Sequence, residues 1–429
     1  MDTLSTSQIP QLAEHLFRHE TGKLISALTG VFGIHRLQLA EDVVQDAMIR
    51  ALQTWPYYGV PANPAAWLMQ TAKNKALDVI RREKWFQDKL PEVTATLHDL
   101  TNAPGDDSHD DEIADNRLRL IFACCHPSIP LEDQTTLALK TLCGFNIQEI
   151  ASSCFTSEAA IAKRLTRAKQ RIQEQQIAFE IPEGNDLSIR LEGVLRVIYL
   201  VFNEGYKASS GSCVVREDLC HEAIRLGALL VSHPATDLPR THALLALMWM
   251  NAARLKTREG ESGNVLRLQE QDRTRWDHAM LGRGLLHFSR AAAGTDLSEY
   301  HLQAGITACH CTAPDFASTD WAQILAYYDR WLEMSASPVV ALNRAVALAE
   351  VHGPEAGLAA IRSLDGVASL AGYYLVDAVK GDLEERCGHF EKAASYFQSA
   401  SEQTPLAAEK SFLKGRRDQC LRAVAALLE

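Results

Sequence analysis

The chain has 429 residues, which fits two to four domains if a domain has roughly 100–200 residues. Its apolar share of 47% and charged share of 23% are ordinary for a soluble globular protein. No apolar run approaches the ~20 residues that a membrane-spanning helix needs. The first residues lack a basic stretch followed by an apolar one, so we expect no signal peptide, no membrane association and a cytoplasmic location.

Ten cysteines fall mostly inside helical patterns, and no C-x-x-C pair occurs, so reduced and buried thiols are expected. Cys124-Cys125-His126 and Cys309-His310-Cys311 suggest a metal site. Adjacent positions cannot easily wrap one tetrahedral zinc, however, and no partner pair stands at ligand spacing. The G-x-x-x-x-G-K-[ST], G-x-S-x-G and H-E-x-x-H motifs are also missing. We therefore expect no metal, no cofactor and no enzymatic activity.

The N-terminal part predicts three helices. The first covers residues 11–30, and the second covers residues 39–55 with an acidic outer face formed by Asp42, Gln45 and Asp46. Residues 55–64 form a turn-rich loop that contains proline, glycine and exposed aromatics. The third helix begins after Asn63-Pro64, a cap followed by a proline in the first turn.

The third helix has two different faces. Its apolar positions are Leu68, Ala72, Ala76, Val79 and Ile80. The opposite face, beside Trp67, carries Lys73, Asn74, Lys75, Asp78, Arg81 and Arg82. A cationic face with an amide and an aromatic ring can follow phosphates, read a base edge and stack on an unpaired base. The alternative is a solvated surface helix with a tryptophan in the core.

Residues 85–114 change in character. Between His98 and Asp115 there are seven acidic residues and no lysine or arginine, with Pro104-Gly105 as a helix breaker. This composition predicts a mobile acidic linker and not a folded element. The net charge of −11 is unevenly distributed. The acidic residues gather in this stretch, whereas residues 73–84 and 157–171 each contain five basic residues.

A second group of helices resumes at residue 117, and one of them covers residues 131–142. Asn146 can cap a short helix whose Glu149 reaches back to the free amide. A turn follows, and Ser157 then caps a longer helix with Ile161, Leu165, Ala168 and Ile172 inside. This pattern predicts a helix-turn-helix whose second helix enters a major groove. Its outward candidates for DNA contact are Ser157, Glu158, Lys163, Arg164, Arg167 and Lys169. A plain helical bundle with a basic helix is the alternative.

Three segments, in this order, resemble the extracytoplasmic-function (ECF) group of bacterial sigma factors. They are Ala40–Ala51 (AEDVVQDAMIRA), Ala66-Trp67-Leu68 and Ala72–Arg82 (AKNKALDVIRR). The resemblance covers residues 1–180. It implies that Asp42, Gln45 and Asp46 contact a basic coiled coil of the polymerase. It also implies that the third helix melts and reads the downstream promoter element, that the loop before it captures a flipped base, and that the linker threads a cationic groove of the polymerase.

The rest of the chain predicts further helices at residues 187–202, 217–231, 240–256, 275–293 and 297–310. Two helix pairs then follow, at 339–364 and 375–402. The glycines between the helices of each pair, Gly353 and Gly388, stand 35 positions apart, near the ~34-residue period of tetratricopeptide (TPR) repeats. This part resembles the TPR-like extension of one ECF subgroup. Residues 201–206 resemble a signature of that extension, with a capped helix end as the alternative reading.

These observations predict an all-α protein: a sigma region 2-like domain at 10–84, a linker at 85–114, a helix-turn-helix domain at 115–180, a helical extension at 187–310 and repeats at 315–429. The expected function is promoter-specific transcription initiation with core RNA polymerase and promoter DNA as partners. The C-terminal half would act as a built-in regulator that takes a regulatory protein or ligand. Two alternatives stay open. One is a DNA-binding TPR regulator that acts without polymerase, and the other is an enzyme with an unrecognised site in the 187–310 bundle.

Overall fold

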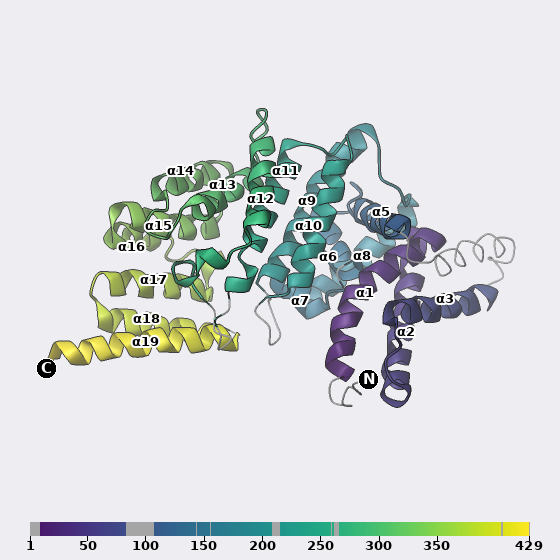
Figure 1. Ribbon diagram of the computed structural model, residues 1–429, viewed down its shortest axis with the longest axis horizontal. Coiled ribbons are helices and arrows are strands. Elements are labelled where there is room, and N and C mark those ends of the chain that lie inside the picture. Colours follow the sequence, from purple (N-terminus) through teal and green to yellow (C-terminus); the bar gives the residue numbers. More distant parts are fainter. Residues whose placement is uncertain are drawn as a thin grey trace. The chain divides into compact units, whose positions relative to one another are not determined.

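The computed structural model describes residues 9–82, 107–142, 144–154, 156–207, 215–258, 260, 266–404 and 406–428. Within these ranges the regular structure is helical and no strand occurs (Figure 1). The all-α prediction is confirmed.

The chain divides into two compact units. The first contains residues 1–204 together with the short segment 233–236, and the second contains residues 205–232 and 237–429. The boundary falls inside helix α9 (Gly184–Tyr206), near its C-terminal end.

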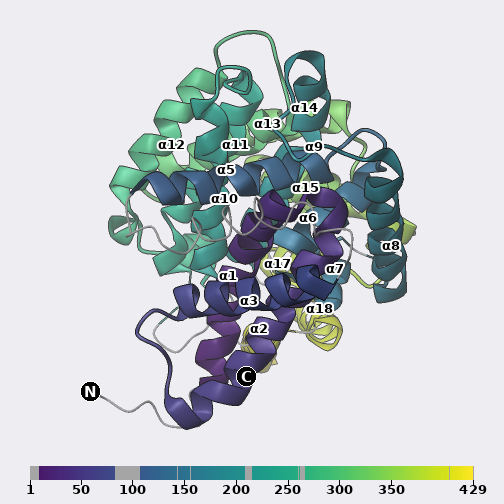
Figure 2. The same ribbon diagram turned by 90° about the vertical axis from the view of Figure 1, so that its right-hand side faces the viewer.

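The N-terminal helices of the first unit are α1 (Ile9–Phe32), the short 3-10 helix η1 (Ile34–Arg36), α2 (Leu37–Tyr58) and α3 (Pro64–Arg82). Both α1 and α3 pack on α2, and α3 crosses it (Figure 2). The interior is apolar, since Leu28, Val44 and Leu68 are at most 1% exposed. The predicted stripe of α3 is largely confirmed, because Leu68, Ala72, Ala76 and Ile80 are all buried.

Helix α2 is longer than predicted. It continues past Trp55 to Tyr58 and includes Pro56. Proline is tolerated in this last turn because the carbonyl that loses its partner belongs to Leu52, whose side chain is 46% exposed to solvent. Gly59 ends the helix at φ +80°, a conformation that favours glycine, and its amide donates to the Trp55 carbonyl at 2.9 Å.

Four further helices complete most of the first unit: α5 (Asp107–Cys124), α6 (Leu131–Leu142), α7 (Ile147–Ser153) and α8 (Glu158–Gln175). Helix α5 begins at residue 107, so the prediction of an unfolded linker is wrong for residues 107–114. The remainder of the predicted linker, up to residue 106, lies outside the described residues.

Helix α9 was predicted to end near residue 202, but it continues to Tyr206. Gly205 allows a close approach within the second unit, because a Cβ atom there would lie 2.7 Å from the Cys220 amide nitrogen and 2.9 Å from the Arg216 carbonyl oxygen. The signature segment 201–206 therefore lies within the packed C-terminal end of α9.

The second unit is a succession of helices. They are α10 (Glu217–Ser232), α11 (Pro239–Ala252), α12 (His278–Ala291), α13 (Glu299–Thr312), α14 (Trp321–Met334), α15 (Pro338–His352), α16 (Pro354–Arg362), α17 (Tyr374–Arg386), α18 (Phe390–Gln403) and α19 (Ala407–Leu428). In the described residues between α11 and α12 lie the 3-10 helices η3 (Leu255–Thr257), η4 (Leu268–Glu270) and η5 (Arg273–Arg275). Another, η6 (Ala368–Leu370), precedes α17.

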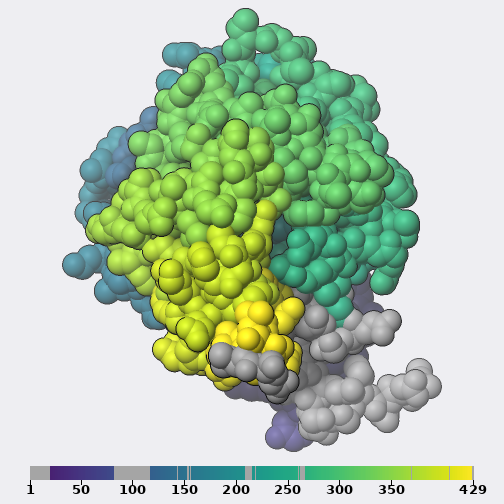
Figure 3. Space-filling model, turned by 90° about the vertical axis from the view of Figure 1, so that its left-hand side faces the viewer, coloured from purple at the N-terminus to yellow at the C-terminus, as the bar shows by residue number. Residues whose placement is uncertain are grey.

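Consecutive helices from α13 to α19 pack side by side, and Figure 3 shows their side chains from green to yellow in chain order. The helix pairs predicted around Gly353 and Gly388 are present, and both glycines have positive φ, at +92° and +80°. Contact within a pair is close. A Cβ atom on Gly381 of α17 would lie 2.9 Å from the Phe397 ring of α18.

Candidate functional site

Helix α3 is positioned by its cap and by aromatic packing. The Asn63 side-chain oxygen accepts from the Ala66 amide at 3.0 Å, which confirms the predicted start of the helix at Pro64. Trp67 packs edge-on against the buried ring of Trp55, with 5.5 Å between ring centroids. Trp67 itself is partly exposed, so one side of its ring is held by the core and part of it faces solvent.

The outer face of α3 carries most of the predicted residues. Asn74, Asp78 and Arg81 are exposed, and Lys75 is 42% exposed at its side chain. The Asn74 oxygen accepts a hydrogen bond from the Gln70 amide at 3.0 Å, which leaves the Asn74 amide nitrogen pointing away from that bond. Lys73 differs from the prediction: it is 7% exposed and lies on the inward side of the helix. The Arg82 side chain lies outside the described residues.

The acidic face of α2 also lies where the sequence predicted it, with Asp42, Gln45 and Asp46 all exposed. Gln38 donates to Asp42 at 2.8 Å, and Lys75 of α3 forms an ion pair with Asp46 at 3.3 Å. The two candidate surfaces, one on α2 and one on α3, therefore adjoin each other in a single small domain.

Sequence reasoning missed two exposed apolar residues on α2. Ile49 and Leu52 are 45% and 46% exposed, and helical spacing puts them on the same face as Gln45. Tyr57 and Tyr58, at the end of the helix, are 84% and 86% exposed. The spacing from Gln45 could have identified Ile49 and Leu52. The exposure of the two tyrosines was predicted, but they lie in the last turn of α2 and not in a loop. Large apolar groups exposed beside polar ones are typical of an interaction surface.

The N-terminal caps of α7 and α8 are built as the sequence predicted. The Asn146 side chain accepts from the Glu149 amide at 2.8 Å, and the Glu149 carboxylate accepts from the Asn146 amide at 2.8 Å. Ser157 caps α8 by accepting from the Ala160 amide at 3.3 Å. The predicted apolar stripe of α8 is confirmed, because Ile161, Leu165, Ala168 and Ile172 are buried.

The polar face of α8 is only partly free. Ser157, Glu158 and Lys163 are exposed. Arg164 donates to Glu132 of α6, and Arg167 forms an ion pair with the buried Asp133 at 2.9 Å while staying 63% exposed at its own side chain. Two carboxylates of α6 thus orient two of the arginines on α8, and Lys163 has no such carboxylate among the described residues.

Lys169 makes a contact that spans the first unit. Its ammonium group lies 2.5 Å from the Glu41 carboxylate and donates to the Gln38 oxygen at 2.8 Å, and both partners belong to α2. The Lys169 side chain is 24% exposed, less than the fully outward position that the sequence predicted. Helix α8 is therefore tied to α2 by a partly buried ion pair between residues 128 positions apart.

The arrangement offers charged, amide and aromatic groups for binding. Within the described residues no group of three or more histidine, cysteine or acidic side chains could hold a metal ion. None of the helices in those ranges is long and apolar enough to cross a bilayer.

Comparison with known families matches two segments of the chain. Residues 16–86 match sigma-70 region 2, and residues 190–292 match a family of unknown function (DUF6596). The first match covers α2 and α3, which carry the surfaces described above. No solved structure matches the chain.

Three relatives extend the comparison. An uncharacterized protein, R00370 of Rhizobium meliloti (strain 1021), is 37% identical over 396 residues, or 92% of each chain. A probable RNA polymerase sigma factor, RfaY of Xanthomonas campestris pv. campestris, is 27% identical over 32% of this chain and 34% of its own. The ECF RNA polymerase sigma factor SigG of Mycobacterium tuberculosis is 25% identical over 35% of this chain and 47% of its own.

The class defined by these matches is that of the RNA polymerase sigma factors. More closely, the chain belongs to the ECF-like sigma factors that carry an extra C-terminal domain, the domain of the family of unknown function.

Proposed function

We propose that this protein binds core RNA polymerase and directs it to particular promoters, without covalent chemistry of its own. One observation carries the proposal: a small domain of the sigma region 2 family presents an acidic face on α2 directly beside an amide-bearing and cationic face on α3. A subunit that joins polymerase to an opened promoter needs both surfaces at once.

The α2 face is the proposed polymerase contact. Asp42, Gln45 and Asp46 would meet a basic helical surface of the polymerase, and the exposed Ile49 and Leu52 would add apolar area to the same contact. Charge complementarity speeds association and sets orientation, while buried apolar groups supply most of the affinity.

The α3 face and the end of α2 are the proposed contacts to the melted downstream element. Asn74 can read a base edge, and Lys75 and Arg81 can follow phosphates. An unpaired base must be held against re-pairing, and stacking on an aromatic ring is worth about 1–3 kcal/mol per base. Tyr57, Tyr58 and Trp67 are the aromatic side chains that can supply it.

Helix α8 is the proposed reader of the upstream element, with α7 as the first helix of a helix-turn-helix. Its exposed N-terminal residues Ser157, Glu158 and Lys163 have the position that base contacts need. Arg164 and Arg167 are held by carboxylates of α6, which limits the number of their side-chain conformations before DNA arrives. Such pre-orientation lowers the entropic cost of binding.

The C-terminal unit is, in this proposal, a TPR-like regulator within the same chain, and it carries no enzymatic activity. Its helix pairs stack as repeat proteins do, and such stacks serve mainly as binding surfaces. It would take the place of a separate regulatory protein.

Co-purification with core polymerase tests the proposal. We expect the full-length chain to bind purified core polymerase and to support transcription from a subset of a promoter library. The variant Asp46→Lys, which reverses a charge on the α2 face, should lose binding to the core, whereas Asp329→Lys, at an exposed position of α14, should not. Promoter DNA binding without any binding to core polymerase would favour the alternative of a polymerase-independent regulator.

A further inference from the structure

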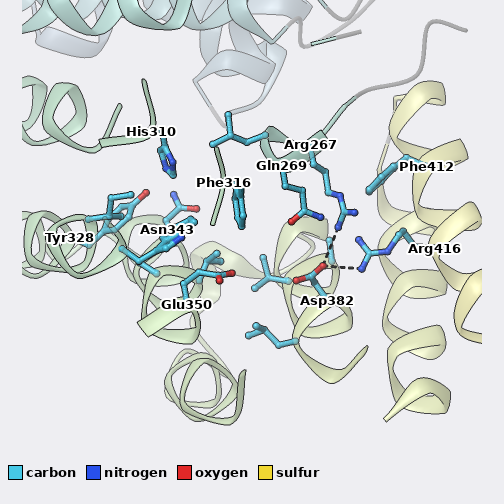
Figure 4. A pocket seen from close by; sticks show the side chains of 18 of the residues that line it. Arg267, Gln269, His310, Phe316, Tyr328, Asn343, Glu350, Asp382, Phe412 and Arg416 are labelled. Carbon is cyan, nitrogen blue, oxygen red and sulfur yellow. Dashed lines mark hydrogen bonds and ion pairs between the residues drawn. The ribbon is translucent and has the colours of Figure 1, made fainter. Parts of the chain in front are cut away.

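The second unit contains a cavity of about 380 Å³ (Figure 4). Helices α14, α15, α17 and α19 supply most of its lining, and the η4 segment contributes Arg267, Leu268 and Gln269. A volume of this size falls in the range of small-molecule sites, which is roughly 300–1,000 Å³.

The walls of the cavity are mainly apolar and aromatic. Phe316, Trp321, Tyr328, Phe397 and Phe412 all line it. The Trp321 ring is fixed edge-on by Phe316 at 5.3 Å and by His310 at 5.2 Å between ring centroids. These rings present flat surfaces that suit a planar apolar ligand.

The charged groups of the lining are already paired with one another or with neighbours. Arg416 donates to Asp382 at 2.9 Å and to Glu385 at 2.6 Å. Arg267 pairs with Glu270 at 2.6 Å and lies 3.5 Å from Asp382. Three carboxylates therefore surround these two guanidinium groups, so the cluster has no excess positive charge to attract an anion, and burying a further ion beside it is costly.

Glu350, the remaining carboxylate of the lining, is paired as well. It accepts from Arg386 at 2.7 Å, so it offers no free negative charge. The described lining therefore has no unpaired charge of either sign with which to attract an ion.

One end of the cavity offers neutral polar groups. His310, Asn343 and Tyr328 lie at the end opposite Arg267, Asp382 and Arg416 in Figure 4. The His310 Nδ1 atom is buried and out of reach of a molecule in the cavity, whereas the side chain of Asn343 is exposed. Burial, together with the nearby guanidinium groups of Arg254 and Arg273, holds the pKa of His310 at about 4, so the imidazole is neutral near pH 7.

We propose that this cavity binds an uncharged small molecule with a planar apolar body and a polar group that hydrogen-bonds Asn343. The apolar body would lie between the aromatic walls, and the polar group would reach the exposed Asn343 amide at the end of the cavity away from the charged pairs. The proposal goes beyond the polymerase function and does not depend on it.

A matched pair of fluorescent probes tests the chemistry. N-phenyl-1-naphthylamine is uncharged and carries one N–H donor, and 8-anilino-1-naphthalenesulfonate has the same ring system with an added sulfonate. We expect the uncharged probe to bind the full-length protein saturably at one site. It should bind at least about tenfold more tightly than the sulfonate probe, because the charged groups of the lining are already paired and offer the sulfonate no counter-charge.

Filling the cavity tests the location. Val346→Phe adds volume from the α15 wall and should weaken binding of the uncharged probe at least about tenfold, whereas Val351→Phe, an exposed position on the same helix outside the lining, should not change it. Val379→Phe on α17 repeats the test, and circular dichroism checks that each variant keeps its helix content. Saturable binding that survives both filling variants, equal binding of the two probes, or no saturable binding of the uncharged probe would each overturn the proposal.

Discussion

At the scale of single residues, the structure distinguishes side chains that are free to bind from those that hold the fold. Lys163 is exposed, while Arg164 and Arg167 are each bound to a carboxylate of α6. An arginine held in this way still presents further N–H donors, because the guanidinium group has five. Partial pairing therefore fixes its direction without using up its capacity to bind DNA.

Replacing Arg164 with alanine tests this view. We expect the variant to remain folded, because the ion pair has an exposed carboxylate partner and such pairs stabilise by only about 0–1 kcal/mol. Promoter choice or occupancy should change, by about 1–3 kcal/mol of discrimination if Arg164 contacts a base. In vitro transcription on a promoter library measures the change, with Gln170→Ala on the same helix as the control. Wild-type promoter preference in the Arg164 variant would argue against α8 as the reading helix.

Two histidines of the second unit predict a pH dependence of stability. Burial is the main cause that lowers the pKa values of His287 and His310 from 6.5 to about 4. Between these values the unfolded chain takes up protons that the folded chain does not, so stability is lost as pH falls from 6.5 toward 4. The slope is at most about 1.4 kcal/mol per pH unit for each histidine.

Urea unfolding at pH 7 and pH 5 measures this effect. The double variant His287→Phe/His310→Phe should show a smaller loss of stability at pH 5 than the wild type. The exposed His278, replaced by phenylalanine, serves as the control and should leave the loss unchanged. An undiminished loss in the double variant would contradict the assignment to these two side chains.

At the scale of elements, α2 and α8 are joined by the contact of Lys169 with Glu41 and Gln38. In the proposed function these helices work on different partners, α2 on polymerase and α8 on the upstream promoter element. The contact would then have to open when both partners are bound. Opening this ion pair separates two side chains and breaks no backbone hydrogen bond, so it does not require either helix to unfold.

Charge reversal at Glu41 tests whether this ion pair holds the two helices together. Glu41→Lys puts two ammonium groups opposite each other, so we expect faster amide hydrogen exchange in η1 and in the contacting part of α8. The double variant Glu41→Lys/Lys169→Glu restores opposite charges and should restore protection, as a double-mutant cycle requires. If the amides of the Glu41→Lys variant exchange at the wild-type rate, the ion pair does not determine how α8 packs in the first unit.

At the scale of the whole molecule, the boundary between the two compact units lies further along the chain than the sequence predicted. The sequence places the end of the DNA-binding part near residue 180, but the first unit extends to Glu204 and includes most of α9. Gly193 of α9 packs tightly in this unit, since a Cβ atom there would lie 2.6 Å from the Gln134 side chain and 3.3 Å from Cys125. A truncation at residue 180 would therefore remove part of the first unit.

Truncation after Tyr206 tests the proposed regulatory role. We expect this fragment to be folded and to show a changed level of promoter-specific transcription with core polymerase, compared with the full-length chain. A fragment that ends at residue 180 should be less stable, because the apolar face of α9 (Leu191, Val194 and Leu195, each at most 2% exposed) is lost from the first unit. Equal transcription by the Tyr206 fragment and the full-length chain would leave the C-terminal unit without a regulatory role.

Features encoded within one or two helical turns could be predicted from the sequence. The caps at Asn63, Asn146 and Ser157 and the apolar stripe of α8 depend on neighbours a few positions away, and the structure has them as expected. Helix ends that depend on packing were harder to predict. The continuation of α9 to Tyr206 follows from its close approach to Arg216 and Cys220, which the local sequence does not reveal.

The sequence by itself determined the all-α class, most helix limits and, through the order of the α2 and α3 segments, the family. Tertiary structure decided that Lys73 faces inward, that Lys169 meets Glu41, and that rings of α14, α18 and α19 line the same cavity. The physical reason is the sequence separation over which each interaction acts. Periodicity and capping act over a few residues, whereas burial, ion pairing and cavity formation depend on segments that only the folded chain brings together.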